Sequence, residues 1–465
     1  MKTEIRYVAA TGALGAGVRS GILEEALSLE PHFIAADAGT TDAGPFYLGS
    51  GQSAFPREAI KRDLSAILLA TRKANIPALV GSAGTAGADV HVDRVLGIAD
   101  EIAREHGLKI RTAVIRSEQD RAYLVRLFGQ GRVRALDPAP AIDEQVFSRS
   151  AHIVGMMGVE PLQAALAEGA EFVLAGRCSD PALYAALPIM KGLPEGLSWH
   201  AGKVTECGTM ACEGRGRGVI TATIREDEIL LRPFGKGLHC TPQSIAAHSL
   251  YESGHPTLHK ECSGTLDLTK SEYEAVDEAT VRVRGSRFIA APEYTVKLEG
   301  AELIGHQSIM IGGIRDPYII KRLDQWLAEI RSSIFAATAR VLGLREEDWT
   351  LVFHVYGRNA VMGSREPDLA SVPHEVGIVV EATAATQELA TKAIQLARQP
   401  FLHHGVPEWM GAITGFACLH NPAHIDRGPV YRFNLNHVAV PHAKTEMFRT
   451  EFVELGRTPI PGNVP

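Results

Sequence analysis

The stretch VLAGRCSDPALYAALPIM, residues 173–190, joins a short apolar run, a polar loop and an apolar helical pattern. A continuous apolar run is typical of a strand that is buried on both faces of a parallel sheet. Arg177 lies just beyond this run, and Asp180 followed by Pro181 is a common start of a helix. The stretch therefore predicts a strand, a loop at its carboxyl end and a helix, which together form the basic unit of an α/β fold.

The same unit recurs through the first half of the chain. Short apolar runs alternate with amphipathic helical patterns, and the other runs lie at residues 5–10, 32–37, 76–82, 108–115 and 151–156. This alternation predicts an open doubly wound α/β domain with a mostly parallel sheet over residues 1–235. After GRGRG (214–218) the pattern changes to a hairpin, a loop-rich segment, further strands and a long helix. Residues 236–465 are therefore predicted to form an α+β domain with an antiparallel sheet.

Composition limits the function classes. The chain has 465 residues, of which 45% are hydrophobic, so it is long enough for two domains with separate cores. A net charge of −7 gives no basic surface of the kind that binds nucleic acid, and no run of 18 apolar residues predicts a membrane span. The six cysteines lack a disulfide-like spacing, and the amino terminus lacks an apolar signal segment. We therefore expect a cytoplasmic protein with a small-molecule ligand, and neither nucleic acid nor membrane as a partner.

Two glycine-containing loops follow predicted strands, where ligands of parallel sheets bind. Gly12, Gly15 and Gly17 form G-x-x-G-x-G, which differs from the dinucleotide motif G-x-G-x-x-G. Free backbone N–H groups at a helix start suit an anion, so Gly12 and Gly15 are predicted to bind a substrate carboxylate or phosphate. A plain tight turn is the alternative. Thr85, in the similar loop VGSAGTAG (80–87), is also predicted to bind the substrate, and N–H groups of either loop are candidates for holding an enolate oxygen.

The loop DAGTT (37–41) resembles the D-x-G-T-T that sugar kinases and Hsp70-like ATPases place around ATP. Here the motif follows a complete strand–helix unit, whereas in those proteins it lies in a hairpin. An ATP-dependent phosphotransferase is therefore kept only as an alternative. Asp37 and Asp42 are predicted to be catalytic carboxylates, and Thr40 and Thr41 to bind the substrate. The same residues also suit Asx- and ST-turns, and a Mg²⁺ held by the aspartates is an option that nothing in the sequence requires.

Four further residues follow strands or helices in polar loops. Arg177 suits the bidentate recognition of a carboxylate, and Asp180 is either a catalytic acid or a helix cap. In VTECGTMACEG (204–214), Glu206 is predicted to transfer protons, and Cys207 is a second catalytic candidate as a thiolate nucleophile. A second Asp-Pro pair, in RDP (315–317), favours a capping role.

Histidines provide two weaker candidates. His255, His259 and Glu261 in HPTLHKEC (255–262) look like metal ligands, but Pro256 argues against a regular helix and loops often expose ordinary histidines. No metal site is predicted.

In LVFHVYGRNAVMG (351–363), strand alternation places His354 and Arg358 on one face. We predict that they bind the substrate from an interdomain cleft, with a solvated sheet face as the alternative.

Together these motifs resemble the acyclic terpene utilisation protein family of the AtuA type, over nearly the whole chain. The resemblance is carried by FIAADAGTTDAGPFYLGSG (33–51), VLAGRCSDPALYAA (173–186), ECG (206–208), GGIRDP (312–317), FHVYGRNAVMG (353–363) and GPVYRFNLNHV (428–438). It implies a bacterial catabolic protein that serves the degradation of citronellol-like terpenes through branched acyl-CoA thioesters. The loop at 37–51 is similar to a subgroup distinct from the founding members, which leaves the substrate open. That subgroup implies a small companion subunit in a hetero-oligomer, and we also expect a homo-oligomer.

The polar strand-end loops lead to a hydratase, dehydratase or isomerase without a cofactor as the first hypothesis. Its substrate would be a small hydroxy- or unsaturated carboxylate or the CoA thioester of one. Addition or removal of water beside a carboxyl group needs a base, an acid and donors for the enolate oxygen. The second hypothesis is a non-catalytic subunit that binds a CoA ester and supports a partner enzyme.

Overall fold

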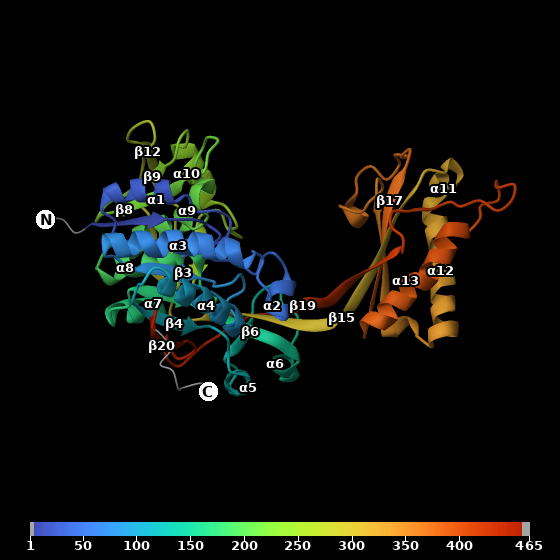
Figure 1. Cartoon of the computed structure of the whole chain (residues 1–465), viewed down its shortest axis with the longest axis horizontal. Coiled ribbons are helices and arrows are strands. Elements are labelled where there is room, and N and C mark those ends of the chain that lie inside the picture. Colours follow the sequence, from blue (N-terminus) through green and yellow to red (C-terminus); the bar gives the residue numbers. More distant parts are fainter. Residues whose placement is uncertain (1–3, 458–465) are drawn as a thin grey trace. The chain divides into compact units, whose positions relative to one another are not determined.

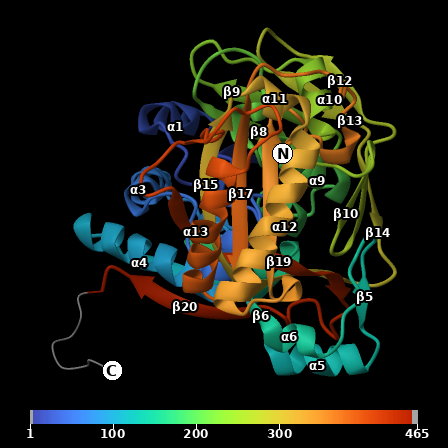
Figure 2. The same cartoon turned by 90° about the vertical axis from the view of Figure 1, so that its right-hand side faces the viewer.

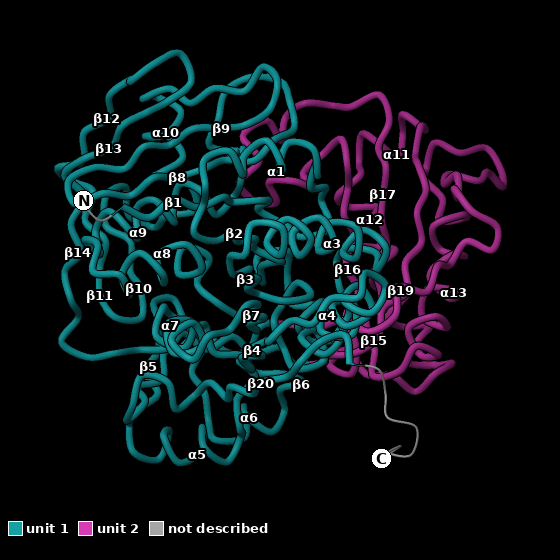
Figure 3. Tube along the Cα trace, turned by 60° about the vertical axis from the view of Figure 1, so that its left-hand side comes forward, with its two compact units in different colours: residues 1–302, 433–465 teal, residues 303–432 magenta. Residues whose placement is uncertain are grey.

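The computed structural model describes residues 4–457 and divides the chain into two compact units, which are coloured separately in Figure 3. The first unit comprises residues 1–302 together with 433–465, and the second comprises 303–432. The boundary predicted near residue 235 falls inside the first unit. Within the described residues, no helix has both the length and the apolar composition needed to cross a membrane.

The first unit is built on a sheet of ten strands in the order β12-β13-β9-β8-β1-β2-β3-β7-β4-β20. Its centre is parallel and consists of β1 (Ile5–Ala9), β2 (Phe33–Asp37), β3 (Ala78–Gly81), β7 (Phe172–Ala175) and β4 (Ile110–Arg116). The flanking strands are antiparallel and comprise β8 (Val219–Ile224), β9 (Ile229–Phe234), β13 (Val281–Arg284), β12 (Glu272–Ala275) and β20 (Arg449–Leu455). The predicted α/β class with a central parallel sheet is confirmed.

Side chains of the central parallel strands point alternately to the two faces of the sheet, and each face has its own hydrophobic core. Val8, Ile34 and Val80 belong to one core, and Tyr7 and Phe33 belong to the other. Helices α1 (Ser20–Ala26), α3 (Arg57–Ala74) and α4 (Asp89–Glu105) contribute to the first core. Helices α7 (Val159–Ala167), α8 (Asp180–Met190) and α9 (Glu195–Thr205) contribute to the second. Both faces of the sheet are therefore covered, as Figure 1 shows for α3 and α8, and this double burial explains the continuous apolar strands.

The strand order changes direction at β7. The chain passes from β3 to β4 and then returns to place β7 between them. The loop after β3 leads to α4 on one face, whereas the loop after β7 leads to α8 on the opposite face. Such a switch point leaves a crevice beyond the carboxyl ends of the two strands, where open α/β sheets bind their ligands.

Smaller elements complete the first unit beside this crevice. A three-stranded antiparallel sheet contains β10 (Leu258–Glu261), β11 (Gly264–Asp267) and β14 (Arg287–Ala290). Strand β6 (Ser150–Met156) pairs with the first part of β15 (Val296–Ile314).

The second unit has an antiparallel sheet, as predicted, formed by β16 (Trp349–Tyr356), β17 (Val376–Ala384), β18 (Ala417–Cys418) and the later part of β15. Helices α12 (Leu323–Leu342) and α13 (Gln387–His403) lie beside each other in this unit (Figure 2). The apolar stripe of α12, which includes Trp326, Ile330 and Ile334, is buried in the core of the unit. The predicted long helix is interrupted at Arg322, which separates the short α11 (Pro317–Lys321) from α12.

Candidate active site

A cavity of about 650 Å³ opens in the first unit at the carboxyl end of β7. Its wall contains five acidic side chains, four basic ones and two histidines. These are Asp42, Asp180, Glu206, Glu252, Glu261, Arg177, Lys203, Lys260, Lys297, His255 and His259. So many titratable groups around one cavity are typical of a catalytic site.

Arg177 forms the electrostatic centre of this wall. Strand β7 ends two residues earlier, and the guanidinium is almost completely buried. Its Nε donates to Glu299 Oε2 at 2.8 Å, and its Nη1 donates to Ser82 Oγ and to the carbonyl oxygen of Cys178, both at 3.2 Å. Burial raises the pKa of Glu299, but the charges of Arg177 and Lys297 together outweigh this effect, and the pKa falls to about 2. Arg177 was predicted to bind the substrate, yet these nitrogens are already engaged by the protein.

Asp180 is the first residue of α8 and faces the cavity. The N-cap position belongs to Ser179, and no side chain caps this helix start, so the capping alternative for Asp180 does not hold. Among residues 4–457, its side chain makes one hydrogen bond, a long one of 3.4 Å from Arg177 Nη1 to Oδ1. Burial raises the pKa of Asp180 to about 6, against the opposing charges of Arg177 and Lys203. Asp180 is therefore ionised near neutral pH and can accept a proton.

Glu206 and Lys203 lie at the carboxyl end of α9, a helix that is buried from its second residue onward. Lys203 Nζ donates to Glu206 Oε1 at 2.6 Å. The other oxygen, Oε2, is buried without a hydrogen-bond partner among residues 4–457. Burial raises the pKa of Glu206 to about 8 despite the ammonium group, and Asp180 contributes to the increase. An unpartnered carboxyl oxygen with a pKa in this range suits proton transfer to a ligand, in line with the predicted role.

Cys207 does not have the environment of a thiolate nucleophile. Burial and then the charge of Glu206 raise the pKa of its thiol far above the usual range. The backbone of Gly12 packs directly on it, because a Cβ at Gly12 would lie 2.5 Å from Cys207 Cα. Gly12 thus serves this close approach, and Cys207 remains a neutral thiol beside Glu206.

Glu261 and His259 were set aside in the sequence as an ordinary loop, but the structure places both in the cavity wall. They alternate with exposed residues on β10. Ser179 Oγ donates to Glu261 Oε2 at 2.7 Å, and burial raises the pKa of Glu261 to about 8. His259 Nε2 is buried without a partner in the described part of the chain, and burial lowers its pKa to about 4. The HPTLHKEC motif therefore lies in the wall of this cavity, and no group of three metal-type ligands forms anywhere in residues 4–457.

The loop DAGTTD (37–42) contributes one residue, Asp42, to the wall. Asp37 is buried at the end of β2, its Oδ1 accepts from the next two backbone N–H groups, and burial and Asp180 raise its pKa well above the usual range. Thr40 Oγ1 accepts from the N–H of Asp42 at 3.0 Å, which is an ST-turn, and Thr41 is buried. Asp42 lines the cavity. Strand β2 pairs in parallel with both neighbours, so the motif does not lie in the hairpin of the ATP-binding folds.

The other predicted anion loops are occupied by the protein itself. The N–H groups of Gly15, Gly17 and Val18 donate to the buried carboxylate of Asp63, each at 2.9 Å. This carboxylate takes the place predicted for a substrate anion at Gly15. Thr85 Oγ1 accepts from the N–H group of residue 54 at 2.9 Å, and so holds a neighbouring loop.

His354 and Arg358 belong to the second unit and have partners there. His354 Nε2 lies 3.2 Å from Glu381 Oε2, and Arg358 Nη2 donates to Asp324 Oδ2 at 3.0 Å. Strand β16 ends before Arg358, which lies in the following turn. Their predicted contact with the substrate stays a prediction.

A family model described as "Acyclic terpene utilisation family protein AtuA" matches residues 50–424. The chain therefore belongs to the AtuA family, and this membership indicates a catabolic role in the use of acyclic terpenes. Searches of curated proteins and of solved structures found no match. The family description names a pathway and not a reaction, and the evidence for the reaction lies in the residues of the cavity.

Proposed function

We propose that this AtuA-family chain is a catabolic lyase or isomerase, most simply a hydratase/dehydratase. Its substrate is a small hydroxy- or unsaturated carboxylate or the CoA thioester of one. Asp180 acts as the base and Glu206 as the acid. The observation that supports this proposal is the difference in pKa between the two carboxyl groups of one cavity, about 6 for Asp180 and about 8 for Glu206.

That difference gives the two groups different protonation states near neutral pH. Asp180 is mostly ionised, whereas burial keeps Glu206 mostly protonated. Pairs of titratable groups whose surroundings separate their pKa values in this way divide the roles of acid and base between them. Glu261, whose pKa is also raised to about 8, would help to keep Glu206 protonated.

Asp180 and Glu206 alone can carry out both proton transfers that dehydration requires. The Asp180 carboxylate removes the proton from the carbon beside the carbonyl group, and the freed electron pair forms the carbon–carbon double bond. The bond to the hydroxyl on the next carbon breaks, and Glu206 gives that hydroxyl its proton, so that water leaves. Asp180 is then protonated and Glu206 is ionised beside Lys203, and exchange of both with solvent restores the starting state. Each acid or base typically contributes about 10²–10⁴-fold to the rate.

Lys260 suits the carboxylate or carbonyl oxygen of the substrate better than Arg177 does. It lines the cavity, and it has no acidic partner within the described part of the chain. Arg177, in contrast, is held by Glu299, Ser82 and a backbone carbonyl. Arg177 therefore acts as a positioning residue that fixes the charge around Asp180.

Exchange of the substrate proton with solvent tests the proposal without knowledge of the exact substrate. The chain is incubated in D₂O with branched 3-hydroxyacyl- and 2-enoyl-CoA thioesters and with the matching free acids. Loss of the proton beside the carbonyl group is followed by ¹H NMR. We expect exchange in at least one compound class, reduced by about 10²-fold or more in Asp180→Asn and in Glu206→Gln.

Glu195→Gln is the matched control, because Glu195 is an exposed carboxylate in the first turn of the same helix as Glu206. It should leave the exchange rate unchanged. Exchange that is undiminished in both active-site variants, or turnover that depends on ATP, would overturn the proposal.

A further inference from the structure

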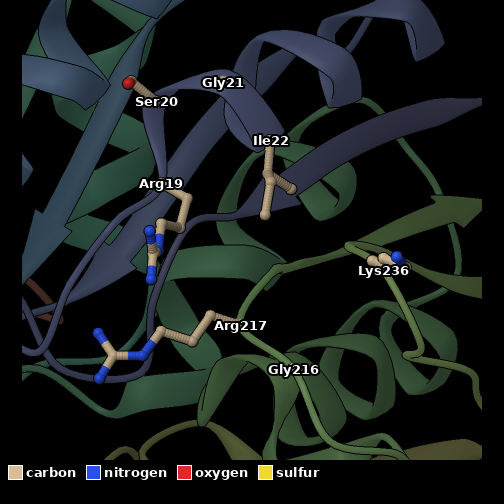
Figure 4. Close-up of a pocket in the computed structure, with 7 residues that line it drawn as sticks. All are labelled: Arg19, Ser20, Gly21, Ile22, Gly216, Arg217 and Lys236. Carbon is tan, nitrogen blue, oxygen red and sulfur yellow. The ribbon is translucent and has the colours of Figure 1, made fainter.

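A second pocket, of about 810 Å³, lies in the first unit beside α1. Three separate segments contribute its basic side chains, Arg19, Arg217 and Lys236. Figure 4 shows the guanidinium groups of the two arginines on one side of the pocket and Lys236 on the other. The remaining lining residues, Ser20, Gly21, Ile22 and Gly216, carry no charge.

The three cations differ from most other basic groups of the unit in lacking an acidic partner. Arg177, Lys203 and Arg225 each form an ion pair with a glutamate. In residues 4–457, no carboxylate lies within ion-pair distance of Arg19, Arg217 or Lys236. Concentrated positive charge without internal compensation attracts an anionic ligand, and more strongly in a concave site.

The GRGRG motif (214–218) builds one wall of this pocket. A Cβ at Gly214 would collide with the carbonyl of residue 237, and one at Gly218 would collide with that of Phe234. Gly216 is similarly close to Lys236, whose carbonyl oxygen would lie 2.7 Å from a Cβ. Alternate glycines thus let the segment pack directly on the chain that carries Lys236, and this brings Arg217 and Lys236 to the same pocket.

The pocket is also close to the candidate active site. Gly12 packs on Cys207, next to Glu206, at one end of the loop after β1. At the other end, a Cβ at Gly17 would lie 3.1 Å from Arg217 Nη1. Five residues of extended chain span at most roughly 17 Å, so this loop holds Arg217 within about that reach of Cys207, the neighbour of Glu206.

We infer that the Arg19/Arg217/Lys236 pocket binds the phosphate groups of CoA, so that the substrate is an acyl-CoA thioester rather than a free acid. This inference rests on the proposed function, because the acyl end must reach the Asp180 and Glu206 cavity. Guanidinium groups recognise phosphate through paired, charge-assisted hydrogen bonds, and a lysine adds a point charge. The flexible arm of CoA places its thioester away from its diphosphate, as the separation of the two sites requires.

Calorimetric titration of the full chain with free CoA tests the pocket independently of catalysis. We expect Arg217→Ala and Lys236→Ala each to weaken CoA binding by about tenfold or more, as loss of a charge-assisted hydrogen bond does. Arg215→Ala is the matched control, because Arg215 is an exposed arginine of the same motif that does not line the pocket. ADP and inorganic phosphate, titrated in parallel, show whether a nucleotide or a bare phosphate is enough.

The outcomes separate the two proposals. CoA binding that is lost in Arg217→Ala and kept in Arg215→Ala supports the pocket, even if no compound exchanges its proton in D₂O. Absence of proton exchange in every compound would instead overturn the proposed function. Absence of CoA binding, or equal losses in Arg215→Ala and Arg217→Ala, would overturn the inference, and exchange on free acids would then leave the proposed function standing. Binding of inorganic phosphate as tight as that of CoA would also contradict a CoA site.

Discussion

Two helices of this chain begin at an Asp-Pro pair, and the two aspartates have different surroundings. Asp316, before α11, accepts from the N–H groups of Tyr318 and Ile319 with Oδ1 and from Trp409 Nε1 with Oδ2. Both carboxylate oxygens are therefore occupied by the second unit itself. Asp180 begins α8 in the first unit and caps nothing, and its one hydrogen bond within the described residues is a long one from Arg177.

The comparison shows that an Asp-Pro pair specifies a helix start and leaves the use of the carboxylate to the tertiary structure. At Asp316 the pair behaves as the capping rule predicts. At Asp180 the preceding Ser179 takes the N-cap position, and the carboxylate turns toward a cavity where burial raises its pKa to about 6. A carboxylate that does not satisfy its own backbone is available for a ligand.

The largest effect is expected from Asp180→Asn. If Asp180 is the base, the substitution removes proton abstraction and lowers the rate of exchange in D₂O by about 10²–10⁴-fold. The free energy of unfolding should change little, since no cap is lost. Asp316→Asn is the matched control and should leave the exchange rate unchanged. Equal losses of activity in the two variants would mean that Asp180 and Asp316 do not differ in role.

The pH dependence of stability provides the next test, at Glu261. Its pKa in the folded state is raised to about 8 from an ordinary value of 4.5, so between these values the unfolded chain releases a proton that the folded chain keeps. Stability contributed by this group therefore falls as the pH rises from 4.5 to 8. Glu261→Gln should leave stability nearly unchanged at pH 4.5 and increase the free energy of unfolding by several kcal/mol, up to about 5, at pH 8.5, as measured by urea denaturation.

Glu299 provides a control of opposite sign. Because Arg177 and Lys297 lower its pKa to about 2, its contribution is present above the ordinary value of 4.5 and is lost as the pH falls toward 2. Glu299→Gln should therefore destabilise the chain at neutral pH. If both substitutions shift stability in the same direction at pH 8.5, the charge assignment of the cavity is wrong.

The sequence predicted the parallel strands and several residues of the cavity wall, because both leave a pattern in a short stretch of sequence. Apolar runs identify buried strands, and polar residues directly after them identify strand-end loops, which is how Arg177, Asp180 and Asp42 were found. The boundary near 235 followed a change of pattern after GRGRG, but β8 and β9 then pair onto β1. Pairing between distant strands leaves no local signal in a single sequence.

The residues that the sequence did not assign reach the cavity through contacts across the chain. Lys203 lies on a helix that is buried from its second residue onward, and its pattern resembles that of any core helix. Glu261 approaches Ser179 across 82 residues of sequence. Raised pKa values, such as that of Glu206, arise from burial and neighbouring charge, which only the folded chain defines.

Asp316→Ala should have a moderate effect that is confined to stability. The substitution leaves two backbone N–H groups at the start of α11 and the indole N–H of Trp409 without their acceptor. Loss of such a cap typically costs about 1–2 kcal/mol. Hydrogen exchange measured by mass spectrometry should show faster exchange in peptides of the second unit, residues 303–432, at an unchanged rate of proton exchange on the substrate.

The smallest effect is expected from Ser179→Ala, which compares the two N-cap positions directly. Ser179 makes no capping hydrogen bond, so its loss should cost less than about 0.5 kcal/mol, below the cost of losing the Asp316 cap. Its hydroxyl instead donates to Glu261 and lowers the pKa of that carboxyl, although burial outweighs this effect. Removal of the hydroxyl should therefore raise the pKa of Glu261. The free energy of unfolding, measured by urea denaturation, should then continue to decline to a higher pH than in the unmodified chain. A loss of stability as large as that of Asp316→Ala, with no shift of that decline to higher pH, would mean that Ser179 serves the helix rather than the carboxyl group of the cavity.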